Sequence, residues 1–246
     1  AATSVVETFG GAKDRRGLRR FFERAADFVY DKPTAWSMAG WAIGALDLDD
    51  CAARWLEGWQ SRTLRSMELL YVANAARDIE RFDDVLEAHR RAVTLPEDAQ
   101  SAAHWAWLAF ELGARGNAGE AREALEQARR RETRVSAVLM AQDATELLLE
   151  VARSHREGEP VALSSAYDLL HRLGKRYAGK AWERYRVQIL HRSFDALTRI
   201  HPTTWNRALG WFYRRTATGP SSPLCAALAF FGFCSLAKLL LERFFL

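Results

Sequence analysis

In this 246-residue sequence, histidine and cysteine, with Asp or Glu partners, could bind a metal, and serine or cysteine could act as a nucleophile. The six histidines show neither HxxxH nor HExxH spacing, the three cysteines form no CxxC pair, and no serine lies in a GxSxG motif. Gly113, Gly116 and Gly119 are spaced by threes, but no predicted strand precedes them, so we interpret them as turn glycines and not as a phosphate-binding loop. The sequence therefore predicts no enzyme, no cofactor and no metal site.

The elements that must position any functional side chain are predicted to be helices. Of all residues, 49% are hydrophobic, and apolar side chains recur at helical spacing along most of the chain. Thr34 is the predicted N-cap of the second helix, and His89 and His104 fall inside later helices, where we expect hydrogen-bonded packing roles. The expected helices cover residues 15–30, 35–46, 51–60, 66–79 and 82–94, two helices within 101–131, then 135–156, 163–176, 179–200 and 205–215.

The helices between residues 15 and 134 recur as pairs. Trp36, Leu69 and Trp105 occupy corresponding positions, 33 and 36 residues apart. In the third pair, the large and small apolar residues follow a regular series: Trp105, Leu108, Ala109, Leu112, Gly116, Ala121, Leu125 and Ala128. The second pair follows the same series with Leu69, Val72, Ala73, Ala76, Phe82, Val85, His89, Ala92 and Pro96. This pattern resembles the tetratricopeptide repeat (TPR) family, whose units are two antiparallel helices with a period near 34 residues.

The resemblance implies an all-α fold, an α-solenoid of stacked antiparallel helix pairs with longer, diverged helices toward the C-terminus. The first pair matches more loosely, and its turn is acidic where the family prefers glycine. In this family the first helix of each pair lines a concave groove. Carried over residue by residue, the resemblance implies a partner-binding groove at Trp41, Tyr71, Asn74, Arg77, Trp107 and Phe110. Such aromatic and arginine side chains often anchor interfaces, although aromatic residues at helical spacing more commonly form a core.

The charge is distributed unevenly. Residues 1–170 contain 22 Lys and Arg against 28 Asp and Glu, whereas residues 171–215 contain 11 against 2. A solvated helix face is one interpretation of the basic stretch, and a surface for phosphates of lipid or nucleic acid is the other. The candidate anion-contacting residues are Arg172, Lys175, Arg176, Lys180, Arg184 and Arg186. Trp182, Tyr185, Trp205 and Trp211 are interleaved with the basic residues, but no nucleic-acid-binding motif accompanies them, so the sequence gives nucleic-acid binding little support.

The C-terminal segment is strongly apolar. Residues 224–237 carry no charge, and the apolar stretch resumes after Lys238. A membrane span needs about 20 apolar residues, so the length favours a buried or interfacial helix. Snorkelling of Lys238 would lengthen the apolar stretch, and Lys238 and Glu242 could also pair on one face of an exposed helix. Membrane attachment and soluble packing or self-association therefore both stay open.

These observations predict five regions: a flexible lead-in (1–14), TPR-like repeats (15–134), diverged or capping helices (135–215, basic from 171), a linker (216–223) and an apolar helix (224–246). The predicted function is a non-enzymatic interaction scaffold that binds a protein, a peptide or a partner helix, with homo-oligomerisation as a further mode. The alternative is a membrane-attached adaptor, anchored by residues 224–246 with a basic cytoplasmic flank. The cysteines fit a reducing compartment, so we expect a cytoplasmic protein.

Overall fold

In the computed structural model, the described part of the chain comprises residues 8, 13–97, 100–157, 163–177 and 183–200. Every regular element within it is helical, which confirms the predicted all-α class. The chain divides into two compact units, Ala1–Leu149 and Glu150–Leu246. The helices are α2 (Arg15–Asp31), α3 (Pro33–Leu46), α4 (Asp49–Trp55), the 3₁₀ turn η1 (Trp59–Ser61), α5 (Ser66–Asp78), α6 (Phe82–Val93), α7 (Ala102–Ala114), α8 (Ala118–Arg129), α9 (Ser136–Arg156), α10 (Leu163–Arg176) and α11 (Glu183–Ile200).

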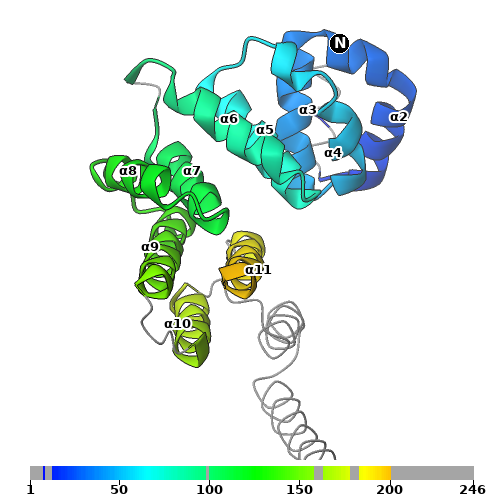
Figure 1. Cartoon of the computed structure of the whole chain (residues 1–246). Coiled ribbons are helices and arrows are strands. Elements are labelled where there is room, and N and C mark those ends of the chain that lie inside the picture. Colours follow the sequence, from blue (N-terminus) through cyan, green and yellow to red (C-terminus); the bar gives the residue numbers. More distant parts are fainter. Residues whose placement is uncertain (1–7, 9–12, 98–99, 158–162, 178–182, 201–246) are drawn as a thin grey trace, which may run out of the picture. The chain divides into compact units, whose positions relative to one another are not determined.

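Figure 1 shows the first unit as a succession of helices, and from α2 to α8 each contacts the next one along the chain. Helices α2 and α4 contact α3, and α3 contacts α5. The pairs α5–α6 and α7–α8 have the most extensive contacts, and α6 also contacts α7. Each of these two pairs is joined by a three-residue turn, so the chain reverses and the helices of a pair are antiparallel.

Three local predictions are wrong, at least in part. Helix α3 begins at Pro33 and not after Thr34, because proline suits the first helical position, where its missing N–H costs no hydrogen bond. The return helix predicted over residues 51–60 stops at Trp55, since Gly58 adopts a left-handed φ of 67° that no α-helix accommodates. Of the three predicted turn glycines, only Gly116 lies in a turn, whereas Gly113 and Gly119 lie inside helices.

The same turn geometry closes three helices of the first unit. Asp47, Glu80 and Gly116 all have left-handed backbone, with φ of 51°, 60° and 85°. In each turn the next N–H donates to the carbonyl five residues earlier, as in a Schellman C-cap. These bonds are Leu48 N to Ile43 O at 3.0 Å, Arg81 N to Ala76 O at 2.8 Å, and Asn117 N to Leu112 O at 3.0 Å. The turn residues are separated by 33 and 36 positions, the same intervals that separate Trp36, Leu69 and Trp105.

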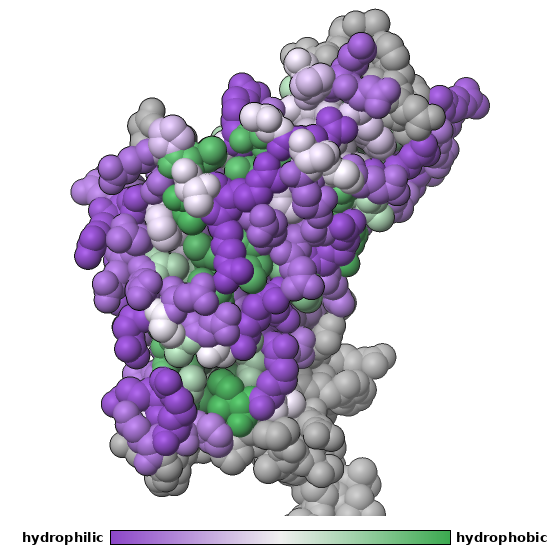
Figure 2. Space-filling model, turned by 45° about the horizontal axis from the view of Figure 1, so that its top comes forward, coloured by the Kyte–Doolittle hydropathy of each residue, from purple (hydrophilic) through white to green (hydrophobic). Residues whose placement is uncertain are grey.

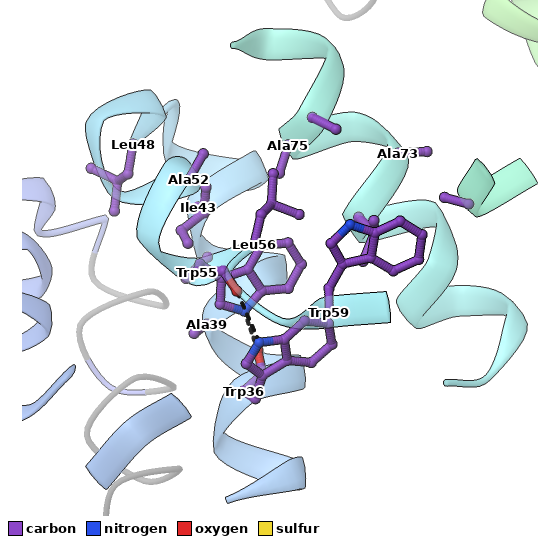
Figure 3. Packing of buried hydrophobic residues seen from close by; sticks show 14 of the residues in the cluster. Trp36, Ala39, Ile43, Leu48, Ala52, Trp55, Leu56, Trp59, Ala73 and Ala75 are labelled. Atoms are coloured by element: carbon purple, nitrogen blue, oxygen red, sulfur yellow. Dashed lines mark hydrogen bonds between the residues drawn. The ribbon is translucent and has the colours of Figure 1, made fainter. Parts of the chain in front are cut away.

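The core of the first unit contains three fully buried tryptophans (Figure 3). The rings of Trp36 and Trp55 are stacked with centroids 4.4 Å apart, and Trp59 is buried in the same cluster. Trp59 donates from Nε1 to Asp84 Oδ1 at 3.0 Å, which ties η1 to α6. A second cluster joins α7 and α8 through Leu108, Leu112 and Leu125.

In the second unit, α10 and α11 contact each other closely. A Cβ at Gly174 would lie 2.9 Å from Leu190 Cδ1, so the absence of a side chain permits this approach. Helix α9 begins in the first unit and ends in the second. The predicted linker (216–223), the apolar helix (224–246), the helix 205–215 and almost all of the lead-in lie outside the described residues.

Candidate functional site

The six predicted groove residues lie on the first helices of three successive pairs. Trp41 is on α3, and Tyr71 and Asn74 are on α5; all three are half-buried. Their neighbours are more deeply placed, with Arg77 on α5 only 4% exposed, and Trp107 and Phe110 on α7 only 3% and 1% exposed. Three of the six side chains therefore reach solvent in part, and the other three are covered.

Arg77 is the centre of a buried polar group between α5 and α7. Its guanidinium carbon lies 4.0 Å from the centroid of the Trp107 ring, a short cation–π contact. Its Nη1 donates to Asn74 Oδ1 at 3.0 Å, one turn earlier on α5. Half of the predicted groove residues thus meet here, because Asn74 and Trp107 both hold the same guanidinium.

A chain of hydrogen bonds continues from Arg77 through two histidines. Arg77 Nη2 lies 3.3 Å from His89 Nε2, His89 Nδ1 lies 3.1 Å from His104 Nδ1, and His104 Nε2 lies 3.1 Å from Ser66 O. The Ser66 hydroxyl is also 3.0 Å from His104 Nε2. We expected both histidines to be hydrogen-bonded packing residues, and this expectation is confirmed, since they are 0% and 1% exposed.

The two ends of this chain of hydrogen bonds, Arg77 and the Ser66 carbonyl, determine which nitrogen of each histidine ring carries the proton. Arginine can only donate, so His89 Nε2 must accept and His89 Nδ1 must carry the proton. His104 Nδ1 then accepts the hydrogen bond from His89, and His104 Nε2–H donates a hydrogen bond to the Ser66 carbonyl. Each ring therefore holds one proton, and all bonds run in one direction from α5 through α6 and α7 back to the start of α5.

The electrostatics of the group favour the same neutral state. Burial, reinforced by the neighbouring His104 and the Arg77 charge, holds the pKa of His89 well below 6.5. Burial also lowers the pKa of His104 to about 4, although its bond to the Ser66 carbonyl opposes this shift. A second proton on His104 would place two N–H groups head to head across 3.1 Å. The group can fix three helices in register, but its buried and mutually bonded atoms offer no base to a substrate.

This histidine contact is the feature that the sequence did not reveal. His89 and His104 are 15 positions apart, and Ser66 is 38 positions from His104. Neither interval follows a metal-binding or catalytic motif. The available signal was that both histidines occupy positions on the inward faces of adjacent repeat helices, which predicts burial but not contact between the rings.

The predicted anion-contacting residues lie in the second unit. Arg172, Lys175 and Arg176 on α10 are exposed, whereas Arg184 and Arg186 on α11 are half-buried. Arg186 Nη1 donates to Gly174 O at 3.4 Å, so it also links α11 to α10. Lys180 lies outside the described residues. The structure thus presents three of the six basic side chains on one exposed helix.

Within the part of the chain that the structure describes, no group of three His, Cys, Asp or Glu side chains could hold a metal ion. In the same residues, no helix has the length and apolar character to cross a membrane. Comparison of the chain with protein-family models, with curated proteins and with solved structures finds no match.

Proposed function

We propose that this chain is a non-enzymatic, TPR-like scaffold that binds a peptide or partner helix along the first helices of its pairs. The observation that carries the proposal is the repeated turn at Asp47, Glu80 and Gly116. Three turns with one hydrogen-bonding pattern, spaced by 33 and 36 residues, are what an α-solenoid of similar units requires. The match in spacing supports a structural repeat and not merely a helical chain.

The buried hydrogen-bond chain supports a rigid arrangement of neighbouring pairs. It starts from Arg77 on α5, passes through His89 on α6 and ends by linking His104 on α7 to Ser66. A buried network whose members are bonded to one another stabilises one register of the helices over others. A peptide-binding surface made by several units benefits from such rigidity, because less conformational entropy is lost on binding.

The proposed contact surface consists of the partly exposed members of the predicted groove. Trp41 and Tyr71 pack with one side against the core of the first unit, and α3 contacts α5. Asn74 adds a polar side chain one turn from Tyr71. Half-buried aromatic residues of this kind are rigid and bury a large area on binding. Arg77, which stacks on the Trp107 ring, donates to Asn74 Oδ1 and holds that side chain in place.

One face of the molecule has a mixed surface. On the face seen in Figure 2, hydrophobic side chains reach the surface in small patches, each surrounded by hydrophilic ones. A partner peptide would therefore combine one or two apolar anchors with polar contacts.

A peptide library displayed on phage and selected against the full chain tests this proposal. Tyr71→Ala and Asn74→Ala should each weaken the selected peptides about tenfold or more, in line with removal of an interface anchor. Glu87→Ala, at an exposed position of α6, is the matched control and should leave the affinity unchanged. The groove would be refuted if the selected peptides bound Tyr71→Ala and Asn74→Ala with unchanged affinity, or if Glu87→Ala lowered their affinity equally.

A second candidate function, attachment to an anionic membrane, is favoured by one face of α10. Leu169 is 46% exposed, and Arg172 and Arg176 follow it at positions three and seven, so an apolar and two basic side chains share a face. We propose this face as the flank of the apolar segment 224–246, at the cytoplasmic side of a membrane.

Sedimentation with phosphatidylserine vesicles tests the membrane proposal. Replacing Arg172, Lys175 and Arg176 by Glu should reduce the bound fraction several-fold, whereas Arg122→Glu and Arg130→Glu on the other unit should not. A chain ending at Pro220 separates the contribution of the apolar segment. If neutral vesicles bind as well as anionic ones, or if nucleic acid competes for the same residues, the basic face is not a lipid contact.

A further inference from the structure

A separate cleft opens between the end of α8 and the beginning of α9, in the first unit. Its volume is about 440 Å³, which is within the range of small-ligand sites. Three arginines line it, Arg129, Arg131 and Arg134, together with Leu139 and Gln142 from the first turns of α9. None of these residues belongs to the predicted groove or to the basic stretch after residue 170.

Two of the arginines are held in place by the protein itself. Arg129 Nη2 donates to Glu146 Oε2 at 2.6 Å. Arg131 lies over the Trp105 ring at 5.3 Å and donates from Nη2 to Gln100 Oε1 at 3.0 Å. Their guanidinium groups are therefore preorganised, and less side-chain entropy is lost when they bind an anion.

The third arginine is exposed and makes no ion pair with any described residue. Arg134 lies two residues before the first residue of α9, whose backbone N–H groups and dipole add positive potential near it. Glu132 also lines the cleft and offsets one positive charge, while Glu146 offsets that of Arg129. The balance is a single positive charge, which matches one carboxylate better than a doubly charged phosphate.

Gln142, which lines the cleft, carries a hydrogen-bond donor that the protein does not satisfy. Gln142 is only 7% exposed, and its Nε2 is buried without a hydrogen-bond partner. Such an orphan donor is costly, since a buried amide left unpaired typically loses about 1–3 kcal/mol. Because Gln142 lines the cleft, a turn of its side chain presents this amide to a carboxylate oxygen there, while the arginines neutralise the ligand's charge. Leu139 lines the same cleft and would contact an apolar group beside the carboxylate.

From these contacts we infer that the cleft between α8 and α9 binds a carboxylate carried next to an apolar group. Arg134 and Arg131 supply charge, Gln142 supplies the buried donor, and Leu139 supplies the apolar contact. The carboxylate comes either from an acidic side chain of a peptide or from a small organic acid. The site shares no residue with the groove at Trp41, Tyr71 and Asn74.

The probes are acetyl-Leu-Glu-Leu-amide, its neutral analogue acetyl-Leu-Gln-Leu-amide, isovalerate and inorganic phosphate. Each is titrated into the full chain while the side-chain N–H signals of arginine and glutamine are followed by NMR. We expect the Glu peptide to bind at least tenfold more tightly than the Gln peptide. If isovalerate binds as tightly as the Glu peptide, the site is confirmed and its ligand is a small acid. Tighter binding of phosphate, or equal binding of the two peptides, would overturn the inference.

Two substitutions and a matched control locate the binding. Arg134→Gln should weaken the Glu peptide at least tenfold, whereas Arg122→Gln, at an exposed position within α8, should not. Gln142→Leu keeps the side-chain volume but removes the orphan donor, so the chain should melt at a higher temperature and yet bind the Glu peptide more weakly. If Gln142 had only a structural role, Gln142→Leu would raise the melting temperature without weakening the binding of the Glu peptide. That result would contradict the assignment of Gln142 to the site.

Discussion

Trp36 and Trp55 bind each other's backbone. Trp36 Nε1 donates to Trp55 O at 3.1 Å, and Trp55 Nε1 donates to Trp36 O at 2.8 Å (Figure 3). The two stacked rings thereby satisfy both indole N–H groups and the carbonyl at the end of α4 inside an apolar core. This reciprocal contact joins α3 to α4, and it requires close approach of the Trp55 ring to the α3 backbone.

Gly40 on α3 provides the space for that ring. A Cβ at Gly40 would clash with the Trp55 ring at Cζ2, so Gly40→Ala should lower the free energy of unfolding by about 1–3 kcal/mol, as overpacking does. Gly44→Ala is the control on the same helix. It has no atom within 4 Å of the added Cβ, and should raise stability by about 0.5–1 kcal/mol. Urea denaturation measures both, and equal effects of the two substitutions would contradict the packing described here.

Glu80 is a non-glycine residue in a left-handed turn. Glu80→Gly should increase stability by about 1 kcal/mol, because the strain of a Cβ at a φ of 60° is removed. Gly116→Ala, at the corresponding turn with a φ of 85°, should decrease stability by a similar amount. Glu87→Gly within α6 is the control for glycine itself and should destabilise. A loss of stability in Glu80→Gly would show that the two turns are not equivalent.

The buried histidines predict a loss of stability in acid. Since the folded-state pKa of His104 is about 4 and the unfolded value is 6.5, the unfolded chain binds more protons between these values. The contribution of neutral His104 to the free energy of unfolding is therefore fully present above pH 6.5. It falls by about 3 kcal/mol as the pH drops toward 4. His89, whose pKa is also lowered, steepens the fall.

His104→Gln tests whether His104 is the group whose titration lowers stability in acid. A glutamine can accept from His89 with its oxygen and donate to the Ser66 carbonyl with its nitrogen, but it does not titrate. Denaturation midpoints between pH 4 and 7 should therefore depend less on pH in this variant than in the parent chain. An unchanged slope in His104→Gln would show that this histidine is not the group that titrates.

Asp84 and Asp83 are adjacent acidic residues with very different surroundings. Asp84 accepts hydrogen bonds from Trp59 Nε1 and Gln60 Nε2, each at 3.0 Å, and pairs with Arg81. Asp84→Ala should cost about 2–3 kcal/mol because the buried Trp59 N–H loses its acceptor. Asp83, paired with Arg115 at the surface, should cost no more than about 1 kcal/mol when replaced by Ala. Thermal melting of both variants distinguishes them, and similar losses would argue against a buried role for Asp84.

The sequence by itself determined the helical class, most helix bounds in the described residues and the 33- and 36-residue intervals. These properties are local: apolar periodicity marks a helix, and turn residues such as Gly116 end it. The predicted helix bounds were wrong at Thr34 and at residues 56–60. There the backbone preferences of Pro33 and of the left-handed Gly58 decided the helix end, and not the apolar periodicity. The residues predicted to form the groove lie within helices, as expected, for the same local reason.

Only the tertiary structure decided which side chains meet. The exposure of a helix face depends on the neighbour that covers it, so Arg77 and Trp107 are buried while Tyr71 and Asn74 reach solvent in part. The contact between His89 and His104, the pairing of Trp36 with Trp55 and the cleft at Gln142 join residues from separate helices. Such contacts depend on the distances between packed helices. The spacing of residues along the sequence does not give these distances.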